Sequence, residues 1–289
     1  MLPQASPAEP GALLRAHAVV KNYGPTPALR RASVHVREGE IVAVTGPRGS
    51  GKTTLLACLG CALPLDDGEV WLDGVPLHGL RRRNRDRIRR DHFGFITTMP
   101  LLVPELDAVE NVAVPLMAAG ASRRQAHADA IEWLERLDVG DLAKARPASL
   151  DITSRQRVAA ARALAGRPRI VLADDPAAPL PRDEGDHLLR VVTTAARSHG
   201  ITLLLALTRE SAADAADRVV RMADGRITQG LGGHDANEQA PAGASPTAPT
   251  PPTSTATRPL SEPVDQVSDA AAPPAAEAAE PAVDGRGGA

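Results

Sequence analysis

A short glycine-rich stretch, Gly46-Pro47-Arg48-Gly49-Ser50-Gly51-Lys52-Thr53-Thr54, carries the residues of this chain best suited to chemistry. Two glycines with four residues between them, followed by Lys and Thr, form the pattern of a phosphate-binding loop. Gly49 and Gly51 can adopt backbone angles closed to other residues, so successive N–H groups can point at phosphate oxygens. Lys52 adds positive charge for the β- and γ-phosphates, and the hydroxyl of Thr53 can bind Mg²⁺. The stretch therefore predicts a nucleoside triphosphate site formed by Gly46, Gly49, Ser50, Gly51, Lys52, Thr53 and Thr54.

The segments on either side of this loop agree with that interpretation. Residues 41–44 are a short β-branched apolar run, which is typical of a buried parallel strand. Residues 53–59 favour a helix, whose N-terminal dipole would also face the phosphates. A chance match in a glycine-bearing turn would not bring this strand and this helix with it.

A second carboxylate site follows from another apolar run. Residues 170–173 predict a buried strand, and Asp174 stands where that strand ends. This is a suitable place for a carboxylate that holds Mg²⁺, directly or through water. Asp175, the next residue, could act on an attacking water. Thr53 and Asp174 are therefore the candidate metal-binding residues.

Strands that alternate with helices predict an α/β fold built on a parallel sheet. Further nearly all-apolar runs predict strands at 93–96 and 201–207, and helical patterns occupy 105–165 and 183–198. Alternating or turn-bounded segments at 16–21, 29–36 and 68–74 predict an antiparallel β layer near the N-terminus. A closing hairpin is expected over 217–227.

Composition predicts three regions along the chain. Residues 1–12 form a flexible tail, 13–230 a folded domain, and 231–289 a disordered tail rich in Pro and Ala with mostly acidic charges. We expect a helical subdomain over about 98–160.

Charge and composition limit the partners. A net charge of −2 and 2% aromatic residues argue against a nucleic-acid binder. The apolar runs are too short to span a bilayer, and no secretory signal is recognisable. The sequence therefore predicts a cytoplasmic protein that reaches a membrane only through a partner.

Two further motifs have plain structural interpretations. The run from Arg81 to Arg90 could be a patch for nucleic acid or anionic lipid, but a solvated helix face is favoured because two Asp residues lie close by and aromatic residues do not interleave. Cys58 and Cys61 form a C-x-x-C pattern, for which two small apolar residues on a packed helix are the favoured interpretation.

Several of these segments together resemble a known family. Tyr23, the Gly46–Thr54 loop and the segments 105–112, 156–164, 172–176 and 224–227 are similar to the nucleotide-binding subunits of ABC transporters, especially those of lipoprotein-releasing and macrolide-exporting systems. The resemblance covers roughly residues 13–230. It implies a P-loop ATPase core that binds ATP and Mg²⁺, with an antiparallel β subdomain and a helical subdomain. It also implies that Tyr23 stacks on adenine, and that the chain forms a homodimer or a heterodimer with another ATP-binding subunit, docked on a separate transmembrane permease at the inner face of the membrane.

The chain departs from this family at positions that matter for hydrolysis. Thr98 stands where the family has the Gln of its Q-loop, and Asp175 stands where it has the catalytic Glu. Arg209 replaces the switch His, and Pro181 replaces the D-loop Asp. The signature LSGGQ becomes Leu150-Asp151-Ile152-Thr153-Ser154, although the Arg155-Gln156-Arg157-Val158 that follows is retained.

In the family, the signature of one subunit contacts the γ-phosphate of the ATP on the other subunit. Asp151 would place a carboxylate against that polyanion, and Ile152 and Thr153 replace glycines that allow close backbone approach. Because the altered groups fall on both halves of each composite site, neither a homodimer nor a mixed dimer has a complete site.

The leading hypothesis is an ATP-binding subunit that holds ATP-Mg through Tyr23, Lys52, Thr53 and Asp174 but hydrolyses it weakly or not at all, in a regulatory or structural role. The alternative is an active transport ATPase in which Asp175 and Arg209 compensate. A third hypothesis is a scaffold that keeps the fold without using nucleotide.

Overall fold

The computed structural model describes residues 11–209 and 213–231. Ten strands are formed by β1 (Ala12–Tyr23), β2 (Thr26–Arg37), β3 (Ile41–Thr45), β4 (Asp67–Leu72), β5 (Val75–Pro76), β6 (Phe93–Ile96), β7 (Ile170–Asp174), β8 (Thr202–Leu207), β9 (Arg218–Ala223) and β10 (Arg226–Leu231) within the described residues. The helices of the described residues are α1 (Lys52–Leu59), α2 (Arg82–His92), α3 (Ala108–Ala118), α4 (Arg123–Arg136), α5 (Ile152–Ala165) and α6 (Arg182–Ser198), with short 3₁₀ turns at Gly140–Leu142 and Pro147–Ser149.

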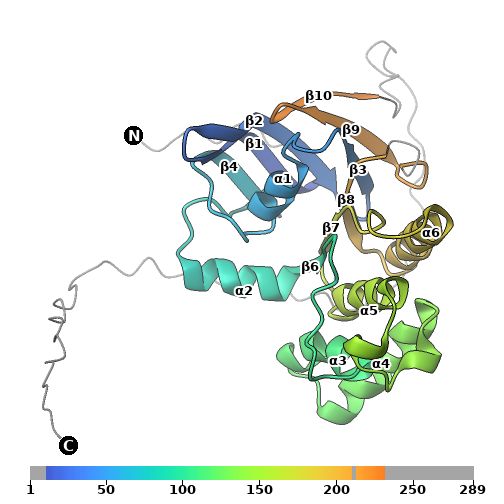
Figure 1. Ribbon diagram of the computed structural model, residues 1–289. Helices are drawn as coiled ribbons and strands as arrows, with labels where there is room; N and C mark the ends of the chain where they lie inside the picture. Colours follow the sequence, from blue (N-terminus) through green and yellow to red (C-terminus); the bar gives the residue numbers. More distant parts are fainter. Residues whose placement is uncertain (1–10, 210–212, 232–289) are drawn as a thin grey trace, which may run out of the picture. The chain divides into compact units, whose positions relative to one another are not determined.

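A six-stranded sheet in the order β10-β9-β3-β8-β7-β6 forms the centre (Figure 1). Strands β9, β3, β8, β7 and β6 run parallel to their neighbours, and only β10 pairs antiparallel, with β9. Every residue of β3 and β8 is buried, which explains why these strands are continuous apolar runs without alternation. The predicted parallel sheet and closing hairpin are confirmed.

A second, antiparallel sheet has the order β2-β1-β4-β5. One hydrophobic cluster joins its inner face to α1 and the central sheet, with Leu14, Leu29, Leu55, Leu59 and Val44 fully or almost fully buried in it. Helix α1, which begins at Lys52 within the phosphate-binding stretch, is therefore fixed from both sides. The predicted antiparallel β layer is confirmed, with β1 beginning at Ala12 and β2 extending from Thr26 to Arg37.

The helices α3, α4 and α5 form the helical part, and their buried side chains share a second cluster with α6 and the other face of the central sheet. Asp107 caps α3 in a capping box with Glu110, and Ser122 accepts a hydrogen bond from the backbone of Gln125 to cap α4. The helical pattern of 105–165 is interrupted at Gly120, which has φ of +97°, and again between α4 and α5.

The tails expected at 1–12 and 231–289 fall mostly outside the described residues. Helix α2 contains most of the arginine run, and of its side chains only Ile88 is buried, as a solvated helix face requires. Cys58 and Cys61 are free thiols, each 3% exposed, but only Cys58 lies on α1; Cys61 follows the end of this helix with φ of +60°. Burial raises the pKa of both thiols to about 11. No described helix combines the length and apolar character needed to cross a bilayer.

Candidate functional site

The phosphate loop connects β3 to α1, and two of its glycines are required by close packing. A Cβ on Gly46 would lie 2.1 Å from the carbonyl oxygen of Met222, and one on Gly51 would lie 2.5 Å from that of Ala28. Gly51 has φ of +102° and directly precedes α1. Gly225, in the turn between β9 and β10, also contacts the loop: its N–H donates to the carbonyl of Ser50 at 3.0 Å. The loop is therefore held in one shape by β2 and by the β9–β10 hairpin.

Lys52 is folded back over this loop. Its Nζ donates to the carbonyl oxygens of Gly46 at 2.7 Å and Pro47 at 2.9 Å, and the residue is 7% exposed. Burial lowers the pKa of Lys52, while the carboxylates of Asp175 and Asp174 act in the opposite direction. The ammonium group is thus held by the carbonyl oxygens of the loop itself.

Thr53 and Asp174 lie side by side, as the sequence predicts. Thr53 Oγ1 donates to Asp174 Oδ1 at 3.0 Å. Two adjacent ligands of an octahedral Mg²⁺ shell at 2.0–2.1 Å lie about 2.9 Å apart, so this pair fits that cation. Burial and the neighbouring Asp175 carboxylate raise the pKa of Asp174, and a bound divalent cation would favour its ionised form.

The described residues contain no cluster of three or more His, Cys, Asp and Glu side chains suited to a metal. A cation at Thr53 and Asp174 would therefore need oxygens from another source. Phosphate oxygens are the usual supplement, because Mg²⁺ is commonly bound by one or two carboxylates together with the phosphates of a nucleotide. The chemistry of the donor set thus fits ATP-Mg better than Mg²⁺ alone.

Thr98 lies beside Thr53 and Asp174, and it contacts Asp174 through the backbone carbonyl of that residue. Its hydroxyl donates to the carbonyl oxygen of Asp174 at 2.8 Å, so it is engaged with the strand end that carries the carboxylate. Gln156, which is fully buried, donates to the carbonyl of Thr97 at 2.8 Å and links α5 to this segment. Sequence reasoning noted Gln156 but gave it no contact, because its partner lies 59 residues away.

Asp175 adopts φ of +45°, an uncommon left-handed conformation for a non-glycine residue. Its backbone N–H donates to the carbonyl of Ala206 at 2.8 Å, and its side chain accepts a short hydrogen bond from the hydroxyl of Thr208. Thr208 is a residue of the candidate site that sequence reasoning missed. Only the parallel pairing of β7 and β8 brings the two together.

Arg209 does not join this cluster through any hydrogen bond or ion pair within the described residues. Its guanidinium pairs with Asp186 on α6 at 3.2 Å. The residue at the switch-His position is therefore directed at a carboxylate of the neighbouring helix. Asp186 was also missed, since nothing in the local pattern marks it.

Tyr23 lies at the end of β1 and is 53% exposed. It pairs with Thr26 in the β1–β2 hairpin, the same hairpin whose Ala28 packs against Gly51. Its ring is accessible for stacking, near the strand that borders the phosphate loop.

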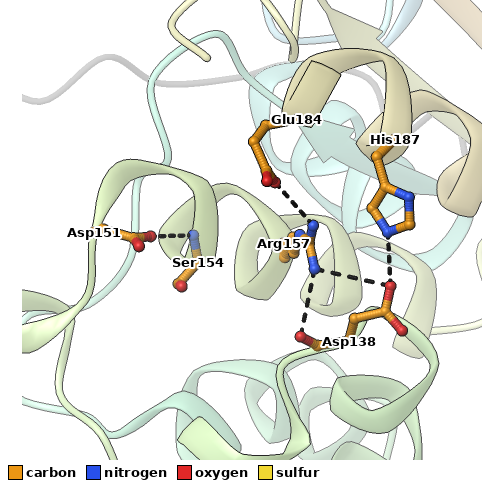
Figure 2. Close-up of polar contacts among 6 residues, drawn as sticks. All are labelled: Asp138, Asp151, Ser154, Arg157, Glu184 and His187. Atoms are coloured by element: carbon orange, nitrogen blue, oxygen red, sulfur yellow. Dashed lines mark hydrogen bonds and ion pairs between the residues drawn. The ribbon is translucent and has the colours of Figure 1, made fainter. Parts of the chain in front are cut away.

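The altered signature segment begins α5. Asp151 is the N-cap of this helix: its Oδ1 accepts from the backbone N–H of Ser154 at 2.6 Å (Figure 2). Hydrogen bonds from Ser154, first from its backbone, lower the pKa of Asp151. The positive end of α5 is thus already matched with an anion of the chain itself.

One turn further along α5, Arg157 links the helical part to α6. Its guanidinium reaches Glu184 of α6 at 3.0 Å and the carbonyl of Asp138 at 3.4 Å (Figure 2). The carboxylate of Asp138 also accepts a hydrogen bond from Nε2 of His187 on α6 at 2.9 Å. These contacts fix the orientation of α5 against α6.

Comparisons with known proteins identify the family to which this fold and phosphate loop belong. Residues 29–178 match the family model described as ABC transporter. The lipoprotein-releasing system ATP-binding protein LolD of Paramagnetospirillum magneticum is 38% identical over 70% of this chain and 89% of its own length. The uncharacterized ABC transporter ATP-binding protein YbbA of Escherichia coli is 37% identical over 67% of this chain and 85% of its own length.

Solved structures give the same result. A structure described as dimeric MJ0796, a bacterial ABC transporter cassette, has a TM-score of 0.72 and 31% identity, covering 76% of this chain and all of that one. A second structure of MJ0796, in a post-hydrolysis state bound to ADP and Pi, has a TM-score of 0.71. The expected ABC ATPase fold is confirmed, and the chain belongs to the ABC transporter family as an ATP-binding subunit similar to LolD.

Proposed function

We propose that this subunit binds ATP-Mg but hydrolyses it weakly or not at all, and acts as a regulatory or structural member of a membrane transport complex. Tyr23, Lys52, Thr53 and Asp174 hold the nucleotide and its cation. The groups that would position and activate water are altered at Thr98, Asp175 and Arg209.

The observation that carries this proposal is the capping of α5 by Asp151. A helix N-terminus attracts phosphate because its first N–H groups lack partners. Here the carboxylate of Asp151 takes the N–H of Ser154 at 2.6 Å. A γ-phosphate presented by a second subunit would meet an anion and an occupied donor in place of open N–H groups.

The contacts around the strand ends point in the same direction. Asp175 is one methylene shorter than Glu, and a misplacement of about 1 Å can cost ~10²-fold in rate. Arg209 pairs with Asp186, and its planar guanidinium differs in shape from the imidazole that the family carries at this position. The hydroxyl of Thr98 already donates to the carbonyl of Asp174, and the Thr side chain is shorter than that of Gln.

The partner proposal rests on an exposed apolar segment and on the relatives. Met99, Leu101 and Val103 follow Thr98 and are exposed, and Val114 and Met117 of α3 are exposed too. Exposed apolar side chains gathered in one segment mark a contact surface. We propose that a separate transmembrane permease covers it, holding the subunit peripherally at the cytoplasmic face of the membrane.

The relatives are named as ATP-binding proteins of a lipoprotein-releasing system, and a solved structure of MJ0796 is described as dimeric. We therefore also propose that this subunit forms a homodimer, or a heterodimer with another ATP-binding subunit.

Binding and hydrolysis of ATP-Mg by the purified full-length chain test the proposal in the same samples. Wild type should bind ATP-Mg and release almost no phosphate, and Lys52→Ala should abolish binding. Lys144→Ala, which removes a lysine elsewhere on the chain, is the matched control and should bind like wild type.

Two results would contradict the proposal. Sustained phosphate release that Asp175→Asn abolishes would establish the alternative, an active ATPase. Absence of ATP binding in wild type at millimolar concentration would leave the scaffold hypothesis.

A gain of function gives the complementary test. One variant restores the family residues at the Q-loop, catalytic, switch and signature positions, leaving Pro181 unchanged. It combines Thr98→Gln, Asp175→Glu, Arg209→His, Asp151→Ser, Ile152→Gly, Thr153→Gly and Ser154→Gln. Phosphate release should rise by at least about tenfold, since each altered group acts on the same transition state. An unchanged rate in a variant that still binds ATP would show that these positions do not limit hydrolysis.

A further inference from the structure

Arg162, on α5, is a half-buried cation that forms no hydrogen bond, ion pair or ring contact within the described residues. Burial lowers the pKa of Arg162, and no nearby carboxylate raises it again. Other half-buried arginines are paired: Arg157, Arg169 and Arg218 reach carboxylates at 3.0, 2.7 and 2.8 Å. Arg162 thus lacks the carboxylate that these three arginines have.

The guanidinium of Arg162 can be reached from outside. Among the described residues, the side-chain atoms that are buried without a partner include Nε of Arg157 and Nε of Arg169, but no nitrogen of Arg162. The stem of this side chain is therefore packed while its charged end meets solvent. A carboxylate from another molecule could bind there without any rearrangement of the core.

The face of α5 that carries Arg162 borders α3. Gly166 follows Arg162 by about one helical turn, so the two residues share a face of the helix. A Cβ on Gly166 would lie 3.3 Å from Cβ of Pro115, which belongs to α3. The two helices lie side by side (Figure 1). Arg162 therefore stands near the α3–α5 joint, which is the line where these helices meet.

The exposed apolar segment 99–103 spans the same joint. On the side of α5, Gln156 donates to the carbonyl of Thr97 at 2.8 Å. On the side of α3, Asn111 accepts from the N–H of Val103 at 2.8 Å and donates to its carbonyl at 3.1 Å. The segment is therefore fixed to both helices, in a place where its side chains border the α3–α5 joint.

An unpartnered cation and an exposed apolar surface thus occur together. Met99 and Leu101 are 58% and 68% exposed, and Val114 stands directly before Pro115 on α3. A partner that covers these apolar side chains would also withdraw Arg162 from water. Burying a charge without a counterion is costly, so such a partner must present an anion at this point.

We propose that Arg162 binds a carboxylate of the transmembrane permease, an Asp or Glu on the cytoplasmic segment whose apolar side chains cover residues 99–103 and Val114. The inference rests on the permease proposed above and adds the chemistry that the permease must present. A guanidinium matches a carboxylate with two parallel hydrogen bonds, and arginines in such desolvated pairs are frequent anchors of protein interfaces.

Zero-length cross-linking of the native complex tests the contact. The tagged full-length chain with Arg162→Lys is expressed in its native cells, and their membranes are treated with a water-soluble carbodiimide, which joins an amine to a carboxylate in contact with it. We expect the new amine to be linked to an Asp or Glu in a cytoplasmic segment of an integral membrane protein, as identified by mass spectrometry. Arg190→Lys, at an exposed position of α6, is the matched control and should give no such product.

Arg162→Gln measures how much the contact contributes. The share of the chain that stays with the membrane protein after detergent purification should fall at least about tenfold, as for an interface hot spot, and Arg190→Gln should behave like wild type. The purified variants should keep the melting temperature and the ATP-Mg affinity of wild type, which excludes a folding defect. Once the cross-linked carboxylate is known, its replacement by Arg together with Arg162→Glu should restore the association.

The outcomes separate this inference from the permease proposal. If wild type and Arg162→Gln stay equally with the membrane protein, or if Arg162→Lys is not cross-linked to that protein, the role of Arg162 is overturned while the permease remains. If no membrane protein stays with wild type, the permease proposal fails and this inference fails with it.

Discussion

Thr53 Oγ1 and Asp174 Oδ1 lie 3.0 Å apart, although 121 residues separate them in the sequence. One belongs to the first turn of α1 and the other to the last residue of β7. The order of the strands creates this relationship, since β8 alone lies between β3 and β7 in the sheet. Both side chains therefore emerge at the same carboxyl edge of the sheet, where α/β folds bind their ligands.

The first prediction concerns the cation. Asp174→Asn keeps the shape and an oxygen acceptor but removes the charge that favours Mg²⁺. We expect the affinity for ATP in the presence of Mg²⁺ to fall on the order of tenfold, as for the loss of one metal-orienting group. With EDTA the affinities of wild type and variant should be similar. Equilibrium binding of a fluorescent ATP analogue measures both.

Asp183→Asn is the matched control, because Asp183 is an exposed residue of the first turn of α6. It should bind ATP like wild type under both conditions. An equal loss of affinity for Asp174→Asn with and without Mg²⁺ would assign Asp174 to the loop structure instead of the cation.

The second prediction separates two kinds of glycine in the phosphate loop. Both Gly49 and Gly51 have positive φ, so Ala costs about 1–2 kcal/mol at either position. Only at Gly51 would the new Cβ also collide, at 2.5 Å, with the carbonyl of Ala28. Gly51→Ala should therefore abolish ATP binding and lower the melting temperature by several degrees more than Gly49→Ala does.

Gly120→Ala controls for backbone strain alone. Gly120 has φ of +97°, with open space where a Cβ would lie, and stands between α3 and α4. The melting temperature of the Gly120→Ala variant should fall about as much as that of the Gly49→Ala variant, and the Gly120→Ala variant should still bind ATP. Equal effects of Gly49→Ala and Gly51→Ala on stability would contradict the packing argument.

The phosphate loop and the parallel sheet could be predicted because their signals are local. A fixed residue spacing defines the loop, and strands buried on both faces are apolar without alternation, as in β3 and β8. Asp174 was found because it ends such a strand. The N-cap at Ser122 marks the start of α4, but the break between α4 and α5 was not located.

The contacts of the candidate site were harder to predict because each joins distant segments. Thr208 meets Asp175 only through the pairing of β7 with β8, and Asp186 meets Arg209 only because α6 packs beside β8. The role of Asp151 changed for a similar reason. Its carboxylate was expected to face a polyanion, and the start of α5 at Ile152 also makes it an N-cap.

The third prediction concerns Arg157, which is 14% exposed and joins α5 to Glu184 and Asp138. Arg157→Ala should lower the free energy of unfolding by about 1–3 kcal/mol, because the charged hydrogen bonds of a mostly buried guanidinium are lost. Arg157→Lys should recover part of this loss, since one ammonium cannot replace a planar fork that reaches two partners. Denaturant unfolding followed by circular dichroism measures both.

Arg182→Ala provides the comparison, since its side chain is 72% exposed and pairs with Asp186 at 3.9 Å. This exposed pair should contribute less than about 0.5 kcal/mol. A double-mutant cycle of Arg157→Ala with Glu184→Gln should give a measurable coupling energy. The control cycle of Arg182→Ala with Glu184→Gln should give none, because these two residues form no ion pair. Equal destabilisation by Arg157→Ala and Arg182→Ala would contradict a structural role for the Arg157 contacts.

The fourth prediction is a pH dependence that arises at Glu40, in the turn before β3. Burial alone would raise the pKa of Glu40, but hydrogen bonds from Arg218 at 2.8 Å and from the backbone of Arg37 at 2.8 Å outweigh it and lower the pKa. A carboxyl whose pKa is lowered on folding stabilises the protein above its unfolded pKa, about 4.3 for Glu. That stability is lost as the pH falls through the lower, folded-state pKa.

Glu40→Gln should therefore lower the free energy of unfolding by about 1–3 kcal/mol at pH 7, because the charged hydrogen bond to Arg218 is lost. The difference from wild type should shrink as the pH falls below about 4, since wild type then loses the same charge. Glu38→Gln is the control: its side chain is 69% exposed, and its effect should stay below about 0.5 kcal/mol at every pH. A difference between wild type and Glu40→Gln that stayed constant from pH 7 to pH 3 would mean that Glu40 acts through packing and not through its charge.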